Sequence, residues 1–325
     1  MSDQISTCTA SEASVTITMG IRTFLSEDST GDPLNNKAHA VEHCAVDSES
    51  LGALGSAVGR QLLIRQASDR LALYTVAERL SVPARAVHVG TAGLARLGAA
   101  PHAPRLNATI ETEFIGGDPE AVARLTEELL GGEDAIGLAV LAPHGGRIEV
   151  GTDCQAELVH DMLALNAKPV RAWIVRGFNR ATGAHTCWHI TSSELSEHSF
   201  PKLGSLVGRA EENGPFAHAV AFHGNNDREA IIVGGGLVRN DGHTELKTTL
   251  AAQIHTALEA VMDQPPSVEV NLSGPLAGAQ RHNIVNRVTV RGNGIQLEQP
   301  LAVRNDVSQR EAIARAVAEF YLDLI

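Results

Sequence analysis

The chain of 325 residues has few aromatic side chains and no long apolar run. Phe, Trp and Tyr make up only 3% of the residues, so the core must be built mainly from Ala, Val, Leu and Ile. No apolar stretch reaches the roughly 18 residues that cross a bilayer. The N-terminal stretch also lacks the basic region and apolar segment of a secretory signal. These absences predict a soluble, cytoplasmic protein that has no membrane partner.

Basic residues are in the minority. The chain has 26 Lys and Arg against 38 Asp and Glu, which gives a formal net charge of −12. Affinity for DNA and RNA comes largely from cations that contact phosphates, so this balance argues against a nucleic-acid partner. Hydrophobic residues at 43% and charged residues at 20% are typical of a globular chain and not of a disordered one.

Cysteine is scarce as well. The four cysteines are widely separated and form no CxxC pair: Cys8, Cys44, Cys154 and Cys187. This spacing argues against both a disulfide framework and a zinc-thiolate site. We therefore expect four free thiols in a reducing compartment.

The sequence changes character near residue 110. Before it, short apolar stretches of strand length are separated by turn residues, at 15–19, 61–65, 71–76 and 86–89. The five residues at 66–70 have the length of a hairpin connection. Residues 1–110 are therefore predicted to form a small β-rich domain of open role, and the Gly- and Pro-containing stretch 98–104 is predicted to be a linker.

Residues 111–325 alternate between strand and helix patterns. Apolar runs predict strands at 135–141, 170–178, 217–222 and 231–233. Asp118 followed by Pro119 predicts the start of a helix that ends at the glycines 131–132. Thr152 or Asp153 is predicted to cap a second helix that runs to about residue 165. Leu246, Leu250, Ile254 and Leu258 recur at helical spacing. Ser308 and Glu311 have the spacing of a capping box before a last helix.

Apolar strands that alternate with helices predict an α/β domain over residues 111–325. Nearly continuous apolar strands are typical of a sheet that is covered on both faces. We therefore expect a mostly parallel or mixed sheet with helices on both faces, preceded by the small β-rich domain.

Two histidines follow predicted strands of this domain. His144 comes after the strand at 135–141, His223 comes after the strand at 217–222, and Glu149 lies five residues beyond His144. The carboxyl ends of parallel strands meet at one edge of a sheet, and two His with one carboxylate form a known type of catalytic zinc site. Glycines 145 and 146 would let the chain turn between His144 and Glu149. The alternative is that both are ordinary loop histidines among the 14 in the chain.

Five segments in order resemble the phage-type poly-γ-glutamate hydrolase family. They are APHGGRIEVGT at 142–152, WHITS at 188–192, FHG at 222–224, NIVNR at 283–287 and GIQLE at 294–298. The resemblance extends over about residues 135–325 and implies a zinc carboxypeptidase-like fold. It implies Zn²⁺ bound by His144, Glu149 and His223, and a catalytic carboxylate at Glu298. It also implies hydrolysis of γ-glutamyl amide bonds.

Bound zinc lowers the pKa of its water to about 7 and polarises a carbonyl. Glu298 would then take a proton from that water and pass it to the leaving nitrogen. The alternative for Glu298 is a surface carboxylate on an edge strand. His and carboxylate ligands also serve manganese and iron, so the residue types alone do not select zinc.

An anionic polymer substrate requires local cations. Guanidinium groups bind carboxylates through two parallel hydrogen bonds, so Arg287, and after it Arg304, are predicted to hold a substrate carboxylate. His189 is predicted to bind the substrate as a hydrogen-bonding group in the pocket. The alternatives are solvated surface charges for the two arginines and a structural role for His189 beside Trp188.

The leading hypothesis is thus a zinc-dependent hydrolase that acts on a glutamate polymer. A zinc deacylase of a small N-acyl amino acid is the alternative within the same chemistry. A non-catalytic binding protein that keeps the fold is the alternative from another class. The oligomeric state and the choice between endo and exo cleavage stay open.

Overall fold

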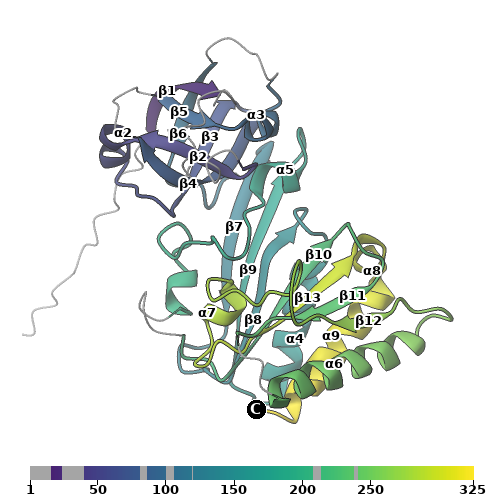
Figure 1. Cartoon of the computed structure of the whole chain (residues 1–325). Coiled ribbons are helices and arrows are strands. Elements are labelled where there is room, and N and C mark those ends of the chain that lie inside the picture. The colour runs from purple at the N-terminus through teal and green to yellow at the C-terminus, as the bar shows by residue number, and fades with distance from the viewer. Residues whose placement is uncertain are drawn as a thin grey trace, which may run out of the picture.

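The computed structural model describes residues 16–23, 40–80, 86–99, 106–118, 120–207, 214–237 and 241–325 (Figure 1). Their strands form a closed six-stranded barrel and a seven-stranded sheet. Cys8 and residues 100–104 of the predicted linker lie outside the described residues. Cys44, Cys154 and Cys187 are free thiols, which confirms the prediction for these three.

The barrel contains the first six strands in the order β1-β5-β2-β4-β3-β6. The strands are β1 (Thr16–Thr23), β2 (His43–Asp47), β3 (Gln61–Ala67), β4 (Arg70–Leu80), β5 (Ala86–Val89) and β6 (Leu106–Glu111), and two short helices, α2 (Ser48–Ala53) and α3 (Thr91–Arg96), lie between them. The predicted hairpin is confirmed, because β3 and β4 pair antiparallel. Small aliphatic side chains such as Val46, Ile64 and Val87 fill the interior, as the low aromatic content requires.

The sheet is mixed, with the order β12-β11-β13-β10-β8-β9-β7. Its strands are β7 (Ala123–Leu130), β8 (Leu138–Gly146), β9 (Val170–Asn179), β10 (His218–Asn225), β11 (Ile231–Gly234), β12 (Val268–Val270) and β13 (Ile295–Pro300). Strands β13, β10, β8 and β9 run parallel to one another. Strand β7 is antiparallel to β9, and β11 is antiparallel to β13. The four central strands therefore bring their carboxyl ends to one edge.

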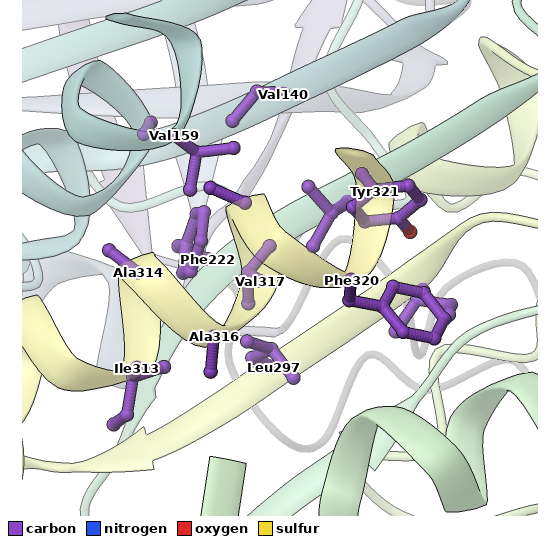
Figure 2. Close-up of a cluster of buried hydrophobic side chains, with 14 of the residues drawn as sticks. Val140, Val159, Phe222, Leu297, Ile313, Ala314, Ala316, Val317, Phe320 and Tyr321 are labelled. Atoms are coloured by element: carbon purple, nitrogen blue, oxygen red, sulfur yellow. The ribbon is translucent and has the colours of Figure 1, made fainter. Parts of the chain in front are cut away.

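Three long helices pack on one face of the sheet: α4 (Thr152–Leu165), α6 (Asp241–Glu259) and α9 (Val307–Leu322). Side chains alternate along β8, so Val140 and Ala142 point into this core. Figure 2 shows Ile313 and Val317 of α9 in the same cluster as Phe222 of β10 and Val140. Among the described residues, no helix is both long and apolar enough to cross a bilayer.

Short helices and connecting loops cover the opposite face of the sheet. Ala139 and Leu141 of β8 pack there against the short helices α5 (Ala184–Trp188), η1 (Leu203–Ser205) and α7 (Ile284–Arg287) and against the chain that connects them. The short helix α8 (Leu301–Asn305) leads from β13 into α9. Helices therefore lie on both faces as predicted, but the long ones share a single face.

The helix predicted from Asp118 to residue 130 is wrong. Residues 123–130 are strand β7, which pairs with the edge of β9, and Pro119 lies outside the described residues. The burial of Leu125 and Glu127 follows the alternation of a strand. Glu127 is buried because its carboxylate accepts the indole N–H of Trp173 at 2.7 Å.

The helix boundaries also need correction at two places. The capping box predicted at Ser308 does not form, because the Asp306 side chain caps α9 by accepting the backbone N–H of Gln309 at 3.0 Å. Helix α4 begins at Thr152 without a side-chain cap. Two other predictions can be compared with the structure. The helix predicted from the spacing of Leu246 to Leu258 is confirmed by α6. The strand predicted at 135–141 is β8, which begins at Leu138, three residues later than predicted.

Candidate metal centre and active site

The parallel strands bring the predicted site residues to one edge of the sheet. His144 lies near the carboxyl end of β8, His223 lies in β10, and Glu298 lies in β13. Strand β10 is between the other two, and His223 is directly opposite Glu298 in the pairing of β10 with β13. Glu149 reaches the same edge from the turn between β8 and α4.

The turn after His144 depends on its glycines. A Cβ on Gly145 would lie 2.6 Å from the Asp153 Cβ, and Gly146 has a φ of 71°, a left-handed conformation that favours glycine. The turn is closed by the backbone N–H of Glu149, which donates to the carbonyl of His144 at 2.7 Å. The carboxylate of Glu149 is thereby returned to the imidazole of His144.

Three ligand atoms converge at this point. Nδ1 of His144 lies 3.1 Å from Oε2 of Glu149 and 3.3 Å from Nδ1 of His223, and the third side of the triangle, between His223 Nδ1 and Glu149 Oε2, is 3.6 Å. All three residues are buried. Metal–ligand bonds of 2.0–2.2 Å in a tetrahedral site place ligand atoms about 3.3–3.5 Å apart. The observed triangle fits one zinc-sized ion.

Both imidazoles of the triangle, those of His144 and His223, have a contact at their second nitrogen, Nε2. Nε2 of His144 donates to the carbonyl of Ile190 at 2.9 Å, which directs its Nδ1 toward the triangle. Nε2 of His223 lies 3.3 Å from the hydroxyl of Ser192. Metal-binding histidines commonly use their second nitrogen in this way to fix the ring and its tautomer.

The shifted pKa values favour an ionised Glu149 and a neutral His223. Burial alone would raise the pKa of Glu149, but the charge and hydrogen bond of His144 and the contact with His223 hold it well below its ordinary value. The backbone N–H of Gly224 also donates to Glu149 at 2.9 Å. Burial lowers the pKa of His223. An ionised carboxylate beside a neutral imidazole is a donor set for a divalent metal.

Glu298 lines the same cavity of about 650 Å³ as the triangle. Burial, together with the negative charge of Glu149, raises the pKa of Glu298 well above its ordinary value, while the charge of Arg304 acts in the opposite direction. The amide of Gln296 donates to Glu298 Oε1 at 3.0 Å. The alternative of a surface carboxylate on an edge strand is wrong, because β13 lies between β10 and β11 and Glu298 is 9% exposed.

His189 also lines the cavity. Its Nε2 lies 3.7 Å from Glu149 Oε1, and its ring centroid lies 4.3 Å from that of His144. The other nitrogen, Nδ1, is hydrogen-bonded to Glu42 of the barrel. No sequence pattern links Glu42 to His189, so the sequence analysis did not identify Glu42 as a residue near the site.

Neither Arg287 nor Arg304 lines this cavity, and the substrate contacts predicted for them stay predictions. Arg287 donates to Glu197 and to the carbonyl of Leu195, each at 2.6 Å, and lines a separate cavity of about 300 Å³. Arg304 is 3% exposed. Its guanidinium donates to two backbone carbonyls, those of Gln299 at 3.1 Å and Val150 at 3.0 Å.

The polar groups that line the cavity beside the four candidate site residues and His189 are neutral. Among the described residues, the cavity lining contains no Lys or Arg. Polar side chains to which the sequence analysis assigned no role line it instead: Thr191, Ser192, Ser193, Gln280, Asn283 and Gln296. The loop 274–280, which contains two glycines, completes the wall.

A family model for poly-gamma-glutamate hydrolase matches residues 131–320, and no curated protein matches the chain. A solved bacteriophage poly-gamma-glutamate hydrolase is 24% identical, with 64% of this chain and 94% of that chain covered and a TM-score of 0.46. YNDL in its zinc-free form is 21% identical, covers 64% and 93%, and has a TM-score of 0.45. A metallo-carboxypeptidase from Burkholderia cenocepacia is 10% identical, covers 68% and 73%, and has a TM-score of 0.39.

The matched residues contain the whole seven-stranded sheet except β7, and all four of His144, Glu149, His223 and Glu298. The barrel lies outside them. More than half of the chain is matched, and the resemblance first noted in five short segments is thus confirmed. The chain belongs to the poly-gamma-glutamate hydrolase family.

Proposed function

We propose that this protein is a zinc-dependent hydrolase that cleaves the γ-glutamyl amide bonds of an anionic glutamate polymer. The observation that supports this most strongly is the triangle of His144 Nδ1, Glu149 Oε2 and His223 Nδ1, with Glu298 in the same cavity. The family is hydrolytic, and the matched residues contain all four side chains. Polymer cleavage is therefore the activity to test first.

His144, Glu149 and His223 would hold the zinc ion. Zinc, when bound, polarises the scissile carbonyl and lowers the pKa of an attacking water. Glu298 accepts the proton of that water and returns it to the leaving nitrogen, which restores the carboxylate for the next cycle. A carboxylate whose pKa lies above its ordinary value is suited to hold a proton between these two steps.

Substrate recognition in this proposal relies on neutral donors. Ser192 and Ser193, which have hydroxyl groups, and Gln280, which has an amide, line the cavity. Neutral hydrogen bonds hold a carboxylate less strongly than a guanidinium pair does. The protein would therefore bind each glutamyl unit weakly, and several units together would supply the affinity.

The same metal centre would serve a deacylase of a small N-acyl amino acid. The test uses the zinc-loaded protein with three substrates: poly-γ-glutamate, poly-α-glutamate and N-acetylglutamate. We expect the γ-linked polymer to shorten on size-exclusion chromatography while the other two stay intact. Release of acetate from N-acetylglutamate with an unchanged polymer would establish the deacylase instead. Binding of the polymer without any cleavage would favour the non-catalytic alternative.

A further inference from the structure

One stretch of chain orients both histidines of the triangle. Residues 186–199, here called the bridging segment, run from the end of α5 across the face of the sheet opposite the long helices. The carbonyl of Ile190 accepts from His144, and the hydroxyl of Ser192 contacts His223. The geometry of the metal centre therefore depends on where the bridging segment is held.

The barrel holds the first part of the bridging segment through Arg96 of α3. This guanidinium is buried, with 4% of the residue exposed. It donates to the carbonyls of Thr186 at 2.7 Å and His189 at 2.9 Å. It is anchored within the barrel by a bond to the carbonyl of Leu73 at 2.6 Å and by the Tyr74 ring, whose centroid lies 5.0 Å away.

Glu42 holds the middle of the bridging segment. Its carboxylate accepts the backbone N–H of Thr191 at 2.8 Å, the Thr191 hydroxyl at 3.2 Å and the Nδ1 of His189. Its backbone carbonyl accepts the N–H of Thr75 in β4 at 2.8 Å, which fixes it to the barrel. Ile190, whose carbonyl orients His144, lies between the two residues that Glu42 holds.

Two more barrel residues hold the last part of the bridging segment. The amide of Gln61 donates to the carbonyl of Glu194 at 2.7 Å and accepts the N–H of Ser196 at 3.1 Å. His43 lies 2.6 Å from the Glu194 carboxylate. The bridging segment is thus hydrogen-bonded to the barrel along most of its length.

We propose that the barrel positions the ligands of the metal centre. Glu42 and Arg96 are the positioning residues: they fix the bridging segment, and the bridging segment in turn orients His144 and His223. This inference rests on the proposed function. The barrel lies outside residues 131–320, which the family model matches. Glu42 and Arg96 therefore belong to a part of the chain that this model does not include. Glu42 does not line the cavity, so it acts on the substrate only through the residues that it holds.

The test compares Glu42→Gln with Glu49→Gln in the full chain. Glu49 is an exposed carboxylate of α2 on the same barrel, so its variant makes the same change away from the bridging segment. Residues that orient metal ligands change metal affinity or activity by about 10–100-fold when they are lost. We expect Glu42→Gln to weaken zinc binding by about tenfold in competition with a chelator, and to speed amide exchange at Thr191 in the metal-free protein.

Steady-state kinetics on poly-γ-glutamate supply a third measurement. We expect Glu42→Gln to lower kcat with KM unchanged, and Glu42→Asp, which keeps the carboxylate, to recover most of the zinc affinity. Equal zinc affinity, Thr191 exchange and kcat in Glu42→Gln and Glu49→Gln would overturn the proposal. If the wild type cleaves no γ-linked polymer, the proposed function fails, whereas zinc affinity and amide exchange still decide whether the barrel positions the centre.

Discussion

His223 and Glu298 are direct partners in the register of the parallel strands β10 and β13. Side chains at paired positions project to the same face of a sheet. The proposed metal ligand His223 and the proposed proton acceptor Glu298 therefore share one cavity because of a single strand pairing. A slip of one residue would turn one of the two to the opposite face. The register of these two strands is therefore the feature of the fold on which the proposed chemistry depends.

The first prediction separates the proton acceptor from the metal ligands. Glu298→Gln removes the proton acceptor and keeps the shape of the side chain, so kcat should fall by about 10²–10⁴-fold. Glu298 is not among the three converging residues, so zinc binding should persist. The measurements are kcat on poly-γ-glutamate and the zinc content of the same preparation. Loss of zinc along with activity would show instead that Glu298 is a ligand.

The second prediction concerns pH. The positive charge of Arg304 lowers the pKa of Glu298, against burial and Glu149, which raise it. Removing that charge in Arg304→Met should raise the pKa of Glu298 further. Glu298 must be ionised to accept a proton, so the acid limb of the kcat/KM profile should move to higher pH.

Arg315→Met is the control for Arg304→Met, because it removes an exposed charge on α9. We expect its profile to match that of the wild type. Arg304→Met also leaves two backbone carbonyls without their donor, which costs about 1–3 kcal/mol of stability, so the profiles are compared well below the unfolding temperature. An acid limb that stays in place or moves to lower pH would contradict the predicted action of Arg304 on Glu298.

The third prediction concerns stability and Glu42. Burial acts to raise the pKa of this carboxyl, but the hydrogen bond and charge of His189 and the charge of Arg96 outweigh it and lower the pKa from 4.5 to about 2. A lowered pKa means that the ionised form stabilises the fold above pH 4.5, and that this contribution is lost as the pH falls toward 2.

Wild type and Glu42→Gln should thus differ most in their free energy of unfolding near neutral pH, by about 1.5–3 kcal/mol for hydrogen bonds to a charged group. The difference should shrink below pH 4.5. Denaturant titrations across this range measure it, with Glu49→Gln as the matched variant. A difference that grows on acidification would reverse the sign worked out for Glu42.

The fourth prediction tests whether Arg287 contacts the substrate. The Arg287 guanidinium is paired with Glu197 outside the cavity, so Arg287→Ala should leave KM for the polymer unchanged. The loss of bonds to a carboxylate and a carbonyl should lower stability by about 1.5–3 kcal/mol, whereas Arg291→Ala, at an exposed position, should not. A large rise in KM with unchanged stability would restore the substrate contact first expected of Arg287.

The sequence was sufficient for the strands that carry the site. Apolar runs ended near His144 and His223, and the structure places both at the same edge of the sheet. It was misleading for β7, because good helix formers follow Asp118 and because the buried face of the strand includes Glu127 in place of an apolar residue. A buried carboxylate hides the alternation by which a strand is recognised.

The positions of the arginines and of Glu42 could not be predicted from sequence. Proximity to a motif does not give the direction of a side chain, and the guanidinium of Arg304 is bound to backbone carbonyls that no sequence pattern reveals. Glu42 lies 147 residues before His189, and the two meet only because the barrel packs beside α5 (Figure 1). Such contacts depend on tertiary packing between distant parts of the chain.

The zinc content of the purified protein, measured beside that of His144→Ala, tests the proposed metal centre. His255→Ala, on the exposed side of α6, is the matched histidine control. We expect about one zinc per chain in the wild type and in His255→Ala, and loss of zinc in His144→Ala. A wild type that binds no zinc even in excess, or a His144→Ala variant that keeps it, would contradict the proposed metal centre.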